Sequence, residues 1–254
     1  MYRERRSRVA GAVVWTHTGA PGRTGEPGDG EGRVLPDGCM DLLMWDGALV
    51  VAGPDTRAHL FARRPGARIT GLRFPPGTGP LVFGVPAHEL CDQRVPLADV
   101  WPERAVRMLA ERVAEAPETG RVLEAVAAGR LAARAPSVTP VSGAVAELLA
   151  GGRSVTEVAA AVGLSERQLR RRCLDAFGYG PKTLARVLRM QEALRLAARG
   201  VPPAEVASAA GYADQAHLSR EVRALAGVPL TRLVPQESRA KRLTPLPSGS
   251  ATTA

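Results

Sequence analysis

The sequence predicts an α+β protein in two parts, a β-rich N-terminal domain that ends in a helical hairpin and an all-α C-terminal domain. Three observations indicate this division. They are short apolar runs between turn residues over positions 7–90, apolar residues at helical spacing over 97–134, and a helical segment that occurs twice after position 137. At 254 residues, the chain is long enough to give each domain its own hydrophobic core.

The first 90 residues contain apolar runs that have the length of β-strands. Three of them are followed by Asp-Gly, Gly-Pro or Pro-Pro-Gly, which form tight turns. Such runs are typical of β-hairpins, and they predict a small sandwich or barrel over residues 7–90. The segment 20–32 is rich in Gly and Pro, which predicts a flexible loop. The apolar runs lie at 9–15, 42–45, 49–52, 69–74 and 81–85.

The spacing of the apolar residues changes after Leu97. They recur every three or four positions as far as Arg134, with an interruption at 117–120, where the sequence is Pro-Glu-Thr-Gly. This spacing predicts two amphipathic helices that form a hairpin over 97–134. Residues 1–135 are therefore the predicted N-terminal domain, the Ala-Pro-Ser sequence at 135–137 the linker, and 237–254 a disordered tail.

The chain carries a formal net charge of +9, and most of it lies in the C-terminal half. Residues 1–135 contain 18 Lys and Arg against 16 Asp and Glu, whereas residues 136–254 contain 16 against 9. A basic surface attracts a polyanion such as nucleic acid or an acidic membrane. No apolar stretch has the length of a membrane span, and the run at 9–15 is barely long enough for the apolar region of a signal peptide and lacks a convincing cleavage site. We therefore expect a cytoplasmic protein without a membrane partner.

A segment of the C-terminal half occurs twice. Residues 157–163 match residues 205–211 at an offset of 48, and residues 169–171 match 218–220 at an offset of 49. Each copy has the chemistry of a helix-turn-helix unit, with a small residue at the helix crossing, a glycine for the turn, an N-cap and a buried leucine. In order, these residues are Ala159, Gly163, Ser165 and Leu169 in the first unit and Ala207, Gly211, Asp214 and Leu218 in the second.

An apolar stripe between the two copies predicts one long helix from Pro181 to Gly200. A helix of about 19 residues is roughly 28 Å long. Successive major-groove segments on one face of DNA lie about 34 Å apart. This helix therefore has a suitable length to hold two recognition helices in adjacent grooves.

With these motifs, residues 137–236 resemble the AraC/XylS family of bacterial transcriptional regulators. The resemblance lies in SVTEVAAAVGLSERQLRRRCLDAFGYGPKTL, in ARVLRMQEALRLAARG and in PPAEVASAAGYADQAHLSREVRALAGVPLTRL. It implies sequence-specific binding of double-stranded DNA, with the second helix of each unit reading bases in the major groove. Three positions depart from the family, because Cys173 and Ala226 replace the usual Phe and Ala216 offers no hydrogen bond. The base-facing positions that the resemblance implies are Arg167, Arg170, Arg171, Gln215, Ala216, Ser219 and Arg220.

Three strings in the N-terminal half, at 35–42, 51–56 and 71–77, look like the N-terminal domain of a subset of AraC-type regulators. This resemblance implies a sensing or dimerisation role. For a sensor, we expect a pocket for a small-molecule effector, in which Arg73 would clamp an anionic group. The alternatives are that Pro-Asp-Gly and Gly-Pro-Asp are simply turns, and that the domain only forms a homodimer through 97–134. The candidate ligand-binding residues are Asp37, Cys39, Asp41, Asp55 and Arg73.

The histidines and cysteines are candidate metal ligands or catalytic groups. His17, His59, the sequence His88-Glu89-Leu90-Cys91 and Cys39 are soft ligands, but no Cys-x-x-Cys pair supports a metal site, and we expect neither a metal nor a cofactor. An enzymatic alternative is DNA alkylation repair with Cys39 as methyl acceptor, since such proteins join an AraC-type module to a cysteine domain. That chemistry needs a four-cysteine zinc cluster, and the N-terminal half has two cysteines. We therefore predict a regulator that is not an enzyme.

Overall fold

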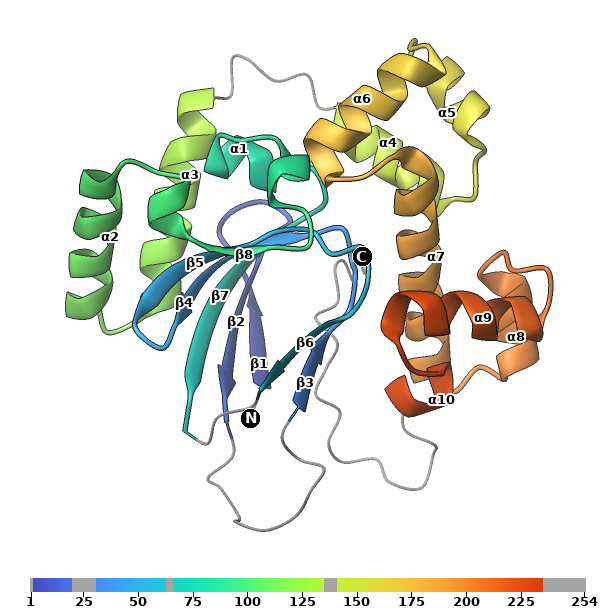
Figure 1. Ribbon diagram of the computed structural model, residues 1–254, viewed down its shortest axis with the longest axis horizontal. Coiled ribbons are helices and arrows are strands. Elements are labelled where there is room, and N and C mark those ends of the chain that lie inside the picture. The colour runs from blue at the N-terminus through green and yellow to red at the C-terminus, as the bar shows by residue number, and fades with distance from the viewer. Residues whose placement is uncertain (1, 20–30, 63–65, 135–140, 235–254) are drawn as a thin grey trace.

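The computed structural model describes residues 2–19, 31–62, 66–134 and 141–234. Figure 1 shows two parts side by side, a β-sheet flanked by helices and a group of helices built around the long vertical helix α7. The predicted α+β class, with the β-rich part first, is confirmed. The predicted linker at 135–137 and tail at 237–254, and most of the predicted loop at 20–32, lie outside the described residues.

The main sheet contains six antiparallel strands in the order β1-β2-β7-β4-β5-β8. Asp46 and Gly47 connect β4 to β5 with φ angles of 47° and 85°, the backbone that a two-residue hairpin turn of type I′ requires. Two further strands, β3 (Glu31–Val34) and β6 (His59–Ala62), pair with each other, and we call them the ribbon. The strands of the main sheet are β1 (Tyr2–Arg6), β2 (Val13–Thr18), β4 (Met40–Trp45), β5 (Ala48–Ala52), β7 (Arg68–Phe74) and β8 (Arg94–Pro96).

Successive side chains along each strand point to opposite sides of the main sheet, so its two faces differ. One face packs its fully buried Leu42, Val51 and Leu72 against the helices of the N-terminal part. The opposite face, which we call the open face, carries a smaller cluster that includes Leu43 and Ile69. The helices on the first face are α1 (Gly79–Phe83), α2 (Glu103–Glu115) and α3 (Thr119–Arg134), with 3₁₀ turns η1 (Ala87–Leu90) and η2 (Leu97–Asp99).

Several predicted elements of this part are wrong in type or extent. The run at 81–85 is predicted as a strand, but its residues 81–83 belong to the short helix α1, because Pro80 in the first turn favours a helix start and Gly84 ends the helix with a φ of 90°. The run at 9–15 begins with a turn, closed by a hydrogen bond of 3.0 Å from the Ala12 N–H to the Val9 carbonyl, so that β2 begins at Val13.

The extent of the β-rich region also differs from the predicted 7–90. Strand β1 lies before it and β8 after it. The predicted loop at 20–32 ends early, since β3 begins at Glu31. The helical hairpin over 97–134 is present, but Thr119 and Gly120 begin α3 instead of interrupting the helices.

An ion pair ties the first strand to the last helix of the N-terminal part. Arg5 donates two hydrogen bonds of 2.9 Å to the carboxylate of Glu124, and the Arg8 N–H donates a third of 2.8 Å. Burial opposes the charged form of Glu124, but these hydrogen bonds outweigh it and lower the pKa of Glu124 to about 2.

The C-terminal part is all helical. Its core includes Leu149, Leu169, Met190 and Leu218, which have relative exposures of 3% or less. Among the described residues, no helix combines the length and the apolar character that a membrane span requires. The helices are α4 (Val141–Ala150), α5 (Val155–Ala161), α6 (Glu166–Phe177), α7 (Pro181–Ala198), α8 (Pro203–Ala209), α9 (Gln215–Ala226) and α10 (Leu230–Leu233).

The two parts share contacts through segments far apart in sequence. Leu35, which follows β3, is 3% exposed and belongs to the core of the helical part. Gln191 on α7 donates a hydrogen bond of 2.5 Å to the Pro36 carbonyl. Near α6, the η1 turn packs on the helix, and His88 lies 3.5 Å from Asp175. The N-terminal part therefore contacts the helical part close to the elements that the sequence assigns to DNA binding.

Candidate nucleic-acid interface

The first helix-turn-helix unit consists of α5 and α6. Ser154 and Ser165 each begin a helix with a capping box, in which the serine oxygen accepts from the backbone N–H three residues later and that residue's side chain accepts from the serine N–H. Such a cap stabilises a helix by about 1 kcal/mol. Between the helices, Gly163 has a φ of 67°, which a residue with a Cβ rarely adopts. The predicted turn glycine and the N-cap at Ser165 are confirmed.

The second unit, α8 and α9, repeats this geometry with different capping chemistry. The carboxylate of Asp214 accepts a hydrogen bond of 2.6 Å from the His217 N–H, and Gly211 has a φ of 75°. Asp214 therefore is the predicted N-cap, and as an acid at a helix N-terminus it also has a favourable interaction with the helix dipole.

The small cores of both units form as predicted. Leu169 and Leu218 are buried, and Ala159 and Ala207 are 3% and 2% exposed where the helices cross. Cys173 has no exposed surface, and burial raises the pKa of its thiol to about 12, so this side chain packs as a small apolar group.

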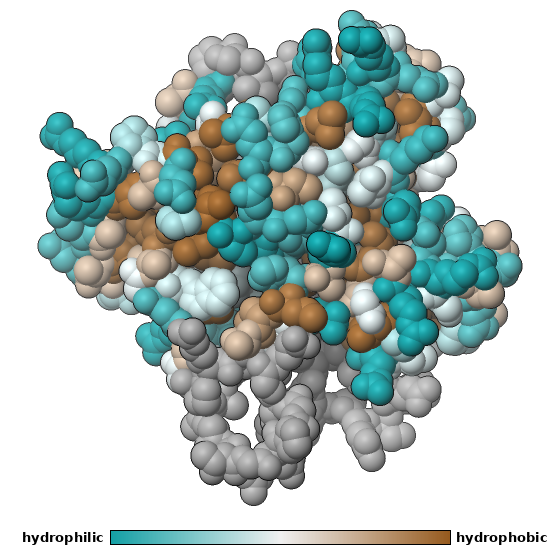
Figure 2. Space-filling model, viewed as in Figure 1, coloured by the Kyte–Doolittle hydropathy of each residue, from teal (hydrophilic) through white to brown (hydrophobic). Residues whose placement is uncertain are grey.

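The outer faces of α6 and α9 hold all the side chains proposed to read DNA. Each of the seven is exposed, and Figure 2 shows hydrophilic side chains gathered over both units. Within the described part of the chain, no ion pair engages Arg167, Arg170 or Arg171. Three guanidinium groups on one helix are therefore available for guanine edges or phosphates. The exposed residues are Arg167, Arg170 and Arg171 on α6 and Gln215, Ala216, Ser219 and Arg220 on α9.

Helix α7 braces the second unit through two arginines that the sequence reasoning did not single out. Arg186 donates hydrogen bonds of 2.7 and 3.2 Å to the carboxylate of Glu221 on α9, and these lower the pKa of Glu221. The Arg189 guanidinium lies 4.7 Å from the ring centre of Tyr212, which follows the turn glycine. Glu221 and Tyr212 therefore fix the second unit on the connecting helix.

Four of the five predicted ligand-binding residues lie together at one end of the open face. Arg73 lies 3.4 Å from Asp37 and 3.3 Å from Asp41, and the Cys39 N–H donates a hydrogen bond of 2.9 Å to Asp37. The fifth, Asp55, instead forms a bidentate pair with Arg94, at 2.9 and 2.6 Å. None of the five lines either of the two cavities described below.

Asp37, Cys39, Asp41 and Arg73 form what we call the charged cluster. Trp15 connects it to the middle of the open face. The Trp15 indole N–H donates a hydrogen bond of 2.7 Å to Asp41. Its ring lies over Gly71, where a Cβ would be 2.3 Å from the indole. The string at 71–77 thus supplies a glycine that accommodates Trp15 and an arginine that neutralises two carboxylates.

The charged cluster faces the joint between α6 and α7. Tyr179, directly after α6, is 5% exposed, and its hydroxyl makes no hydrogen bond within the part of the chain that the structure describes. Burial, together with the nearby Asp37 and Cys39, raises the pKa of this hydroxyl. In the sequence, Tyr179 stands out only as an aromatic residue between two glycines. Its contacts could not be predicted from there, because the residues that surround its hydroxyl belong to the other domain.

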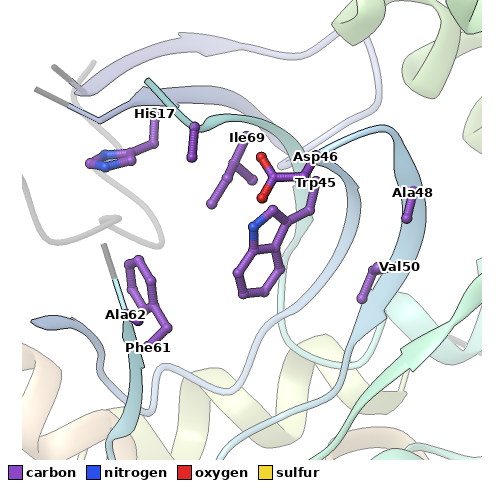
Figure 3. A pocket seen from close by; sticks show the side chains of 9 residues that line it. His17, Trp45, Asp46, Ala48, Val50, Phe61, Ala62 and Ile69 are labelled. Carbon is purple, nitrogen blue, oxygen red and sulfur yellow. The ribbon is translucent and has the colours of Figure 1, made fainter. Parts of the chain in front are cut away.

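A cavity of about 400 Å³ lies at the opposite end of the open face, between the main sheet and the ribbon. Figure 3 shows the side chains of Trp45 and Phe61 turned toward each other, with those of His17 and Asp46 also among the residues that line it. A second cavity, of about 480 Å³, lies between α1, α4 and α6. The sequence reasoning identified neither. The first cavity is lined by His17, Trp45, Asp46, Ala48, Val50, Phe61, Ala62, Ala67 and Ile69.

The remaining candidate ligands do not gather. In the described residues, no group of three or more His, Cys, Asp or Glu side chains has the geometry to hold a metal ion. Cys39 is 4% exposed, and burial beside Asp37 raises the pKa of its thiol well above the ordinary value, which disfavours the thiolate.

Comparison with known proteins gives two family matches. Residues 158–234 match the family described as a helix-turn-helix domain, which is of the AraC type, and residues 12–96 match a domain of unknown function (DUF6597). No curated protein matches the chain significantly.

Among solved structures, ToxT from Vibrio cholerae is similar in outline. The structure of wild-type ToxT bound to an unsaturated fatty acid has 10% identity and a TM-score of 0.45, and the match covers 90% of this chain and 96% of that one. ToxT from Vibrio cholerae O395 has 9% identity and a TM-score of 0.42, with coverage of 90% and 95%.

Proposed function

Since this chain belongs to the AraC family of DNA-binding transcription regulators, we propose that it binds one operator of two half-boxes by placing α6 and α9 in successive major-groove segments on one face of the DNA. We further propose that the N-terminal domain makes this binding depend on a small-molecule effector. Such a regulator acts in the cytoplasm, on the nucleoid.

The first proposal rests on one observation. The capped helices α6 and α9 have exposed outer faces, and the single helix α7 connects the two units. Helix α7 has 18 residues, which corresponds to roughly 27 Å. The hydrogen bonds from Arg186 to Glu221 hold α9 on α7, while α6 continues into α7 through 178–180. A braced connection of this length supports a defined spacing between the two reading helices.

The reading roles follow from side-chain chemistry. Arg167, Arg170 and Arg171 would contact guanine edges or phosphates, and Gln215 would read adenine. Ser219 and Arg220 add hydrogen-bond donors, whereas Ala216 offers only methyl contact. The net positive charge of residues 136–254 adds phosphate neutralisation, so affinity should fall with salt.

A sensor role for the N-terminal domain is supported by the cavity under the ribbon and by its contacts with both helix-turn-helix units, where His88 contacts α6 and where Arg33 and Ala58 contact the end of α9. The sequence predicts an effector site for an anion at Asp37, Cys39, Asp41 and Arg73, which form the charged cluster, and at Asp55. The packing of the charged cluster favours a structural role, because Arg73 already faces two carboxylates. Dimerisation through α2 and α3 is the second candidate role, since Met108 on α2 is 53% exposed.

The methyl-acceptor alternative for Cys39 has little support. A nucleophilic thiol must be accessible and ionised, whereas Cys39 is buried and has a raised pKa. We therefore propose that the protein is not an enzyme.

Selection from a random double-stranded DNA library with the full chain tests the DNA-reading proposal. We expect an enriched site of two half-boxes about one helical turn apart. Binding to this site and to random DNA is then measured across a salt series. Strong preference for the selected site supports two-helix reading, whereas salt-sensitive binding without sequence preference would show that the arginines contact only the backbone.

A further inference from the structure

The ribbon contacts both an apolar cavity and the end of the second reading helix. Arg33 on β3 donates a hydrogen bond of 2.6 Å to the carbonyl of Ala226, the last residue of α9. The Ala58 N–H, just before β6, donates one of 2.7 Å to the Leu225 carbonyl. The last carbonyls of a helix lack intrahelical partners, and a cation there interacts favourably with the helix dipole. Arg33 and Ala58 therefore form a clamp on the C-terminal end of α9.

The same ribbon forms one wall of the cavity. The ring of Phe61 on β6 packs edge-on against Trp45 of the main sheet, with ring centres 6.2 Å apart. Phe61 pairs with Gly32 of β3, and a Cβ at Gly32 would lie 2.1 Å from the phenyl ring. The ring is therefore held over the ribbon backbone, so its position follows the position of the ribbon.

The lining of the cavity indicates the class of ligand. A volume of about 400 Å³ lies within the range of small-molecule sites, and a helix with side chains, at about 10–12 Å across, is too wide for it. Among the residues that the structure describes, apolar and aromatic side chains predominate in the lining, which includes the carboxylate of Asp46 but no lysine or arginine. These properties favour a neutral, largely apolar molecule and disfavour an anion.

We propose that a neutral, largely apolar ligand binds in the cavity that Trp45 and Phe61 line, beside the contact of their rings, holds the ribbon on the main sheet, and thereby tightens the clamp of Arg33 and Ala58 on α9. The proposal rests on the proposed effector role of the N-terminal domain and names its site, ligand class and route. A ligand that contacts both walls stabilises the arrangement in which the ribbon is closed. Because the clamp requires the ribbon in that position, the cavity and α9 are energetically coupled.

The test uses the full chain and the neutral fluorophore prodan, whose emission shifts to shorter wavelength in an apolar site. Prodan titration gives its affinity, and hydrogen exchange measured by mass spectrometry reports on α9. Three variants accompany the wild type. Val50→Phe fills the cavity, Arg33→Ala removes the clamp donor, and Arg57→Ala removes an exposed arginine close to the ribbon as a matched control.

In the wild type, we expect saturable prodan binding that slows the exchange of amides at the end of α9 by roughly fivefold or more and leaves α5 unchanged. Val50→Phe should weaken prodan binding by roughly tenfold. Arg33→Ala should still bind prodan, but its α9 amides should exchange faster and no longer respond to the fluorophore. Arg57→Ala should behave as the wild type.

Three results would overturn the proposal. They are no saturable prodan binding, binding that Val50→Phe leaves unchanged, or binding in the cavity without any effect on α9. Because the assay contains no DNA, these results leave the reading of two half-boxes untouched. Conversely, a library selection without sequence preference would reject that reading and leave the coupling between the cavity and α9 standing.

Discussion

Gly178, at the C-terminal end of α6, lies against the ring of Pro54 from the N-terminal domain, so that a Cβ at Gly178 would be 2.6 Å from the proline Cγ. This glycine has a φ of 82° and caps α6 through a hydrogen bond of 3.0 Å from its N–H to the Leu174 carbonyl. One residue therefore ends the first reading helix and also contacts the N-terminal domain.

A comparison of Gly178→Ala with Gly163→Ala separates the energetic cost of backbone strain from the cost of disturbing the contact between the domains. Both glycines have positive φ, but no atom lies within 4 Å of a Cβ at Gly163. We expect Gly163→Ala to lower the free energy of unfolding by about 1 kcal/mol. Gly178→Ala should lower it by about 2–4 kcal/mol, because overlap with Pro54 is added. Urea unfolding followed by circular dichroism measures both, and equal losses would show that Pro54 yields without cost.

Substitution of the arginines on α6 should weaken specific DNA binding. If Arg167 or Arg170 contacts a guanine edge, its replacement by alanine should cost about 1–3 kcal/mol on the selected site and relax specificity at that base pair. Fluorescence anisotropy with the selected and random DNA measures this loss. Arg107→Ala, which removes an exposed arginine from α2, is the matched control for charge. An equal loss on random DNA would identify a phosphate contact instead.

The charged cluster should respond very differently to the loss of its cation and the loss of one of its acids. Arg73→Met leaves Asp37 and Asp41 buried without their cation, and we expect a loss of about 3–5 kcal/mol in the free energy of unfolding.

Asp37→Asn should cost about 1 kcal/mol or less, because the amide oxygen still accepts from the Cys39 N–H and Asp41 still neutralises Arg73. Burial raises the pKa of Asp37, so its ionisation already opposes folding above that pKa. Denaturant titration at pH 7 compares the two variants. Similar losses would contradict the assignment of Arg73 as the centre of the cluster.

Glu124 should make stability depend on pH. Its pKa is lowered to about 2 in the fold, so its contribution is fully present above the unfolded value near 4.5 and is lost as the pH falls from there toward 2. We expect Glu124→Gln to lower the free energy of unfolding at pH 7 by about 1–3 kcal/mol, since the partly exposed Arg5 reduces the effect through solvent screening. The difference from the wild type should narrow below pH 4.5.

Glu118→Gln provides the control for this pH dependence. Glu118 pairs with Arg121 at the surface, at 2.6 Å with both side chains about half exposed, and its loss should change stability by about 0.5 kcal/mol or less at any pH. Urea unfolding of both variants between pH 7 and acid pH makes the comparison. A loss for Glu124→Gln that stays constant with pH would show that Glu124 acts by packing and not by charge.

The elements that were predicted correctly depend on short-range chemistry. Ser165 caps α6 through a residue three positions later, and Gly163 supplies the positive φ of its own turn. Such interactions are visible in the sequence because both partners lie within one helical turn. The strand predicted at 81–85 is wrong, because a run of four apolar residues and one glycine fits a strand or a buried helix equally well unless Pro80 is recognised as a helix start.

The sequence by itself determined that there are two helix-turn-helix units, which side chains their reading helices expose, and that one helix joins them. Only the tertiary structure decided that Asp37 and Arg73 form a packed cluster, that a cavity lies under the ribbon, and that Arg33 contacts the end of α9. The physical reason is separation along the chain. Arg33 and Ala226 are 193 residues apart, and β3 and β6 pair across an intervening hairpin, so neither contact follows from local propensity or periodicity.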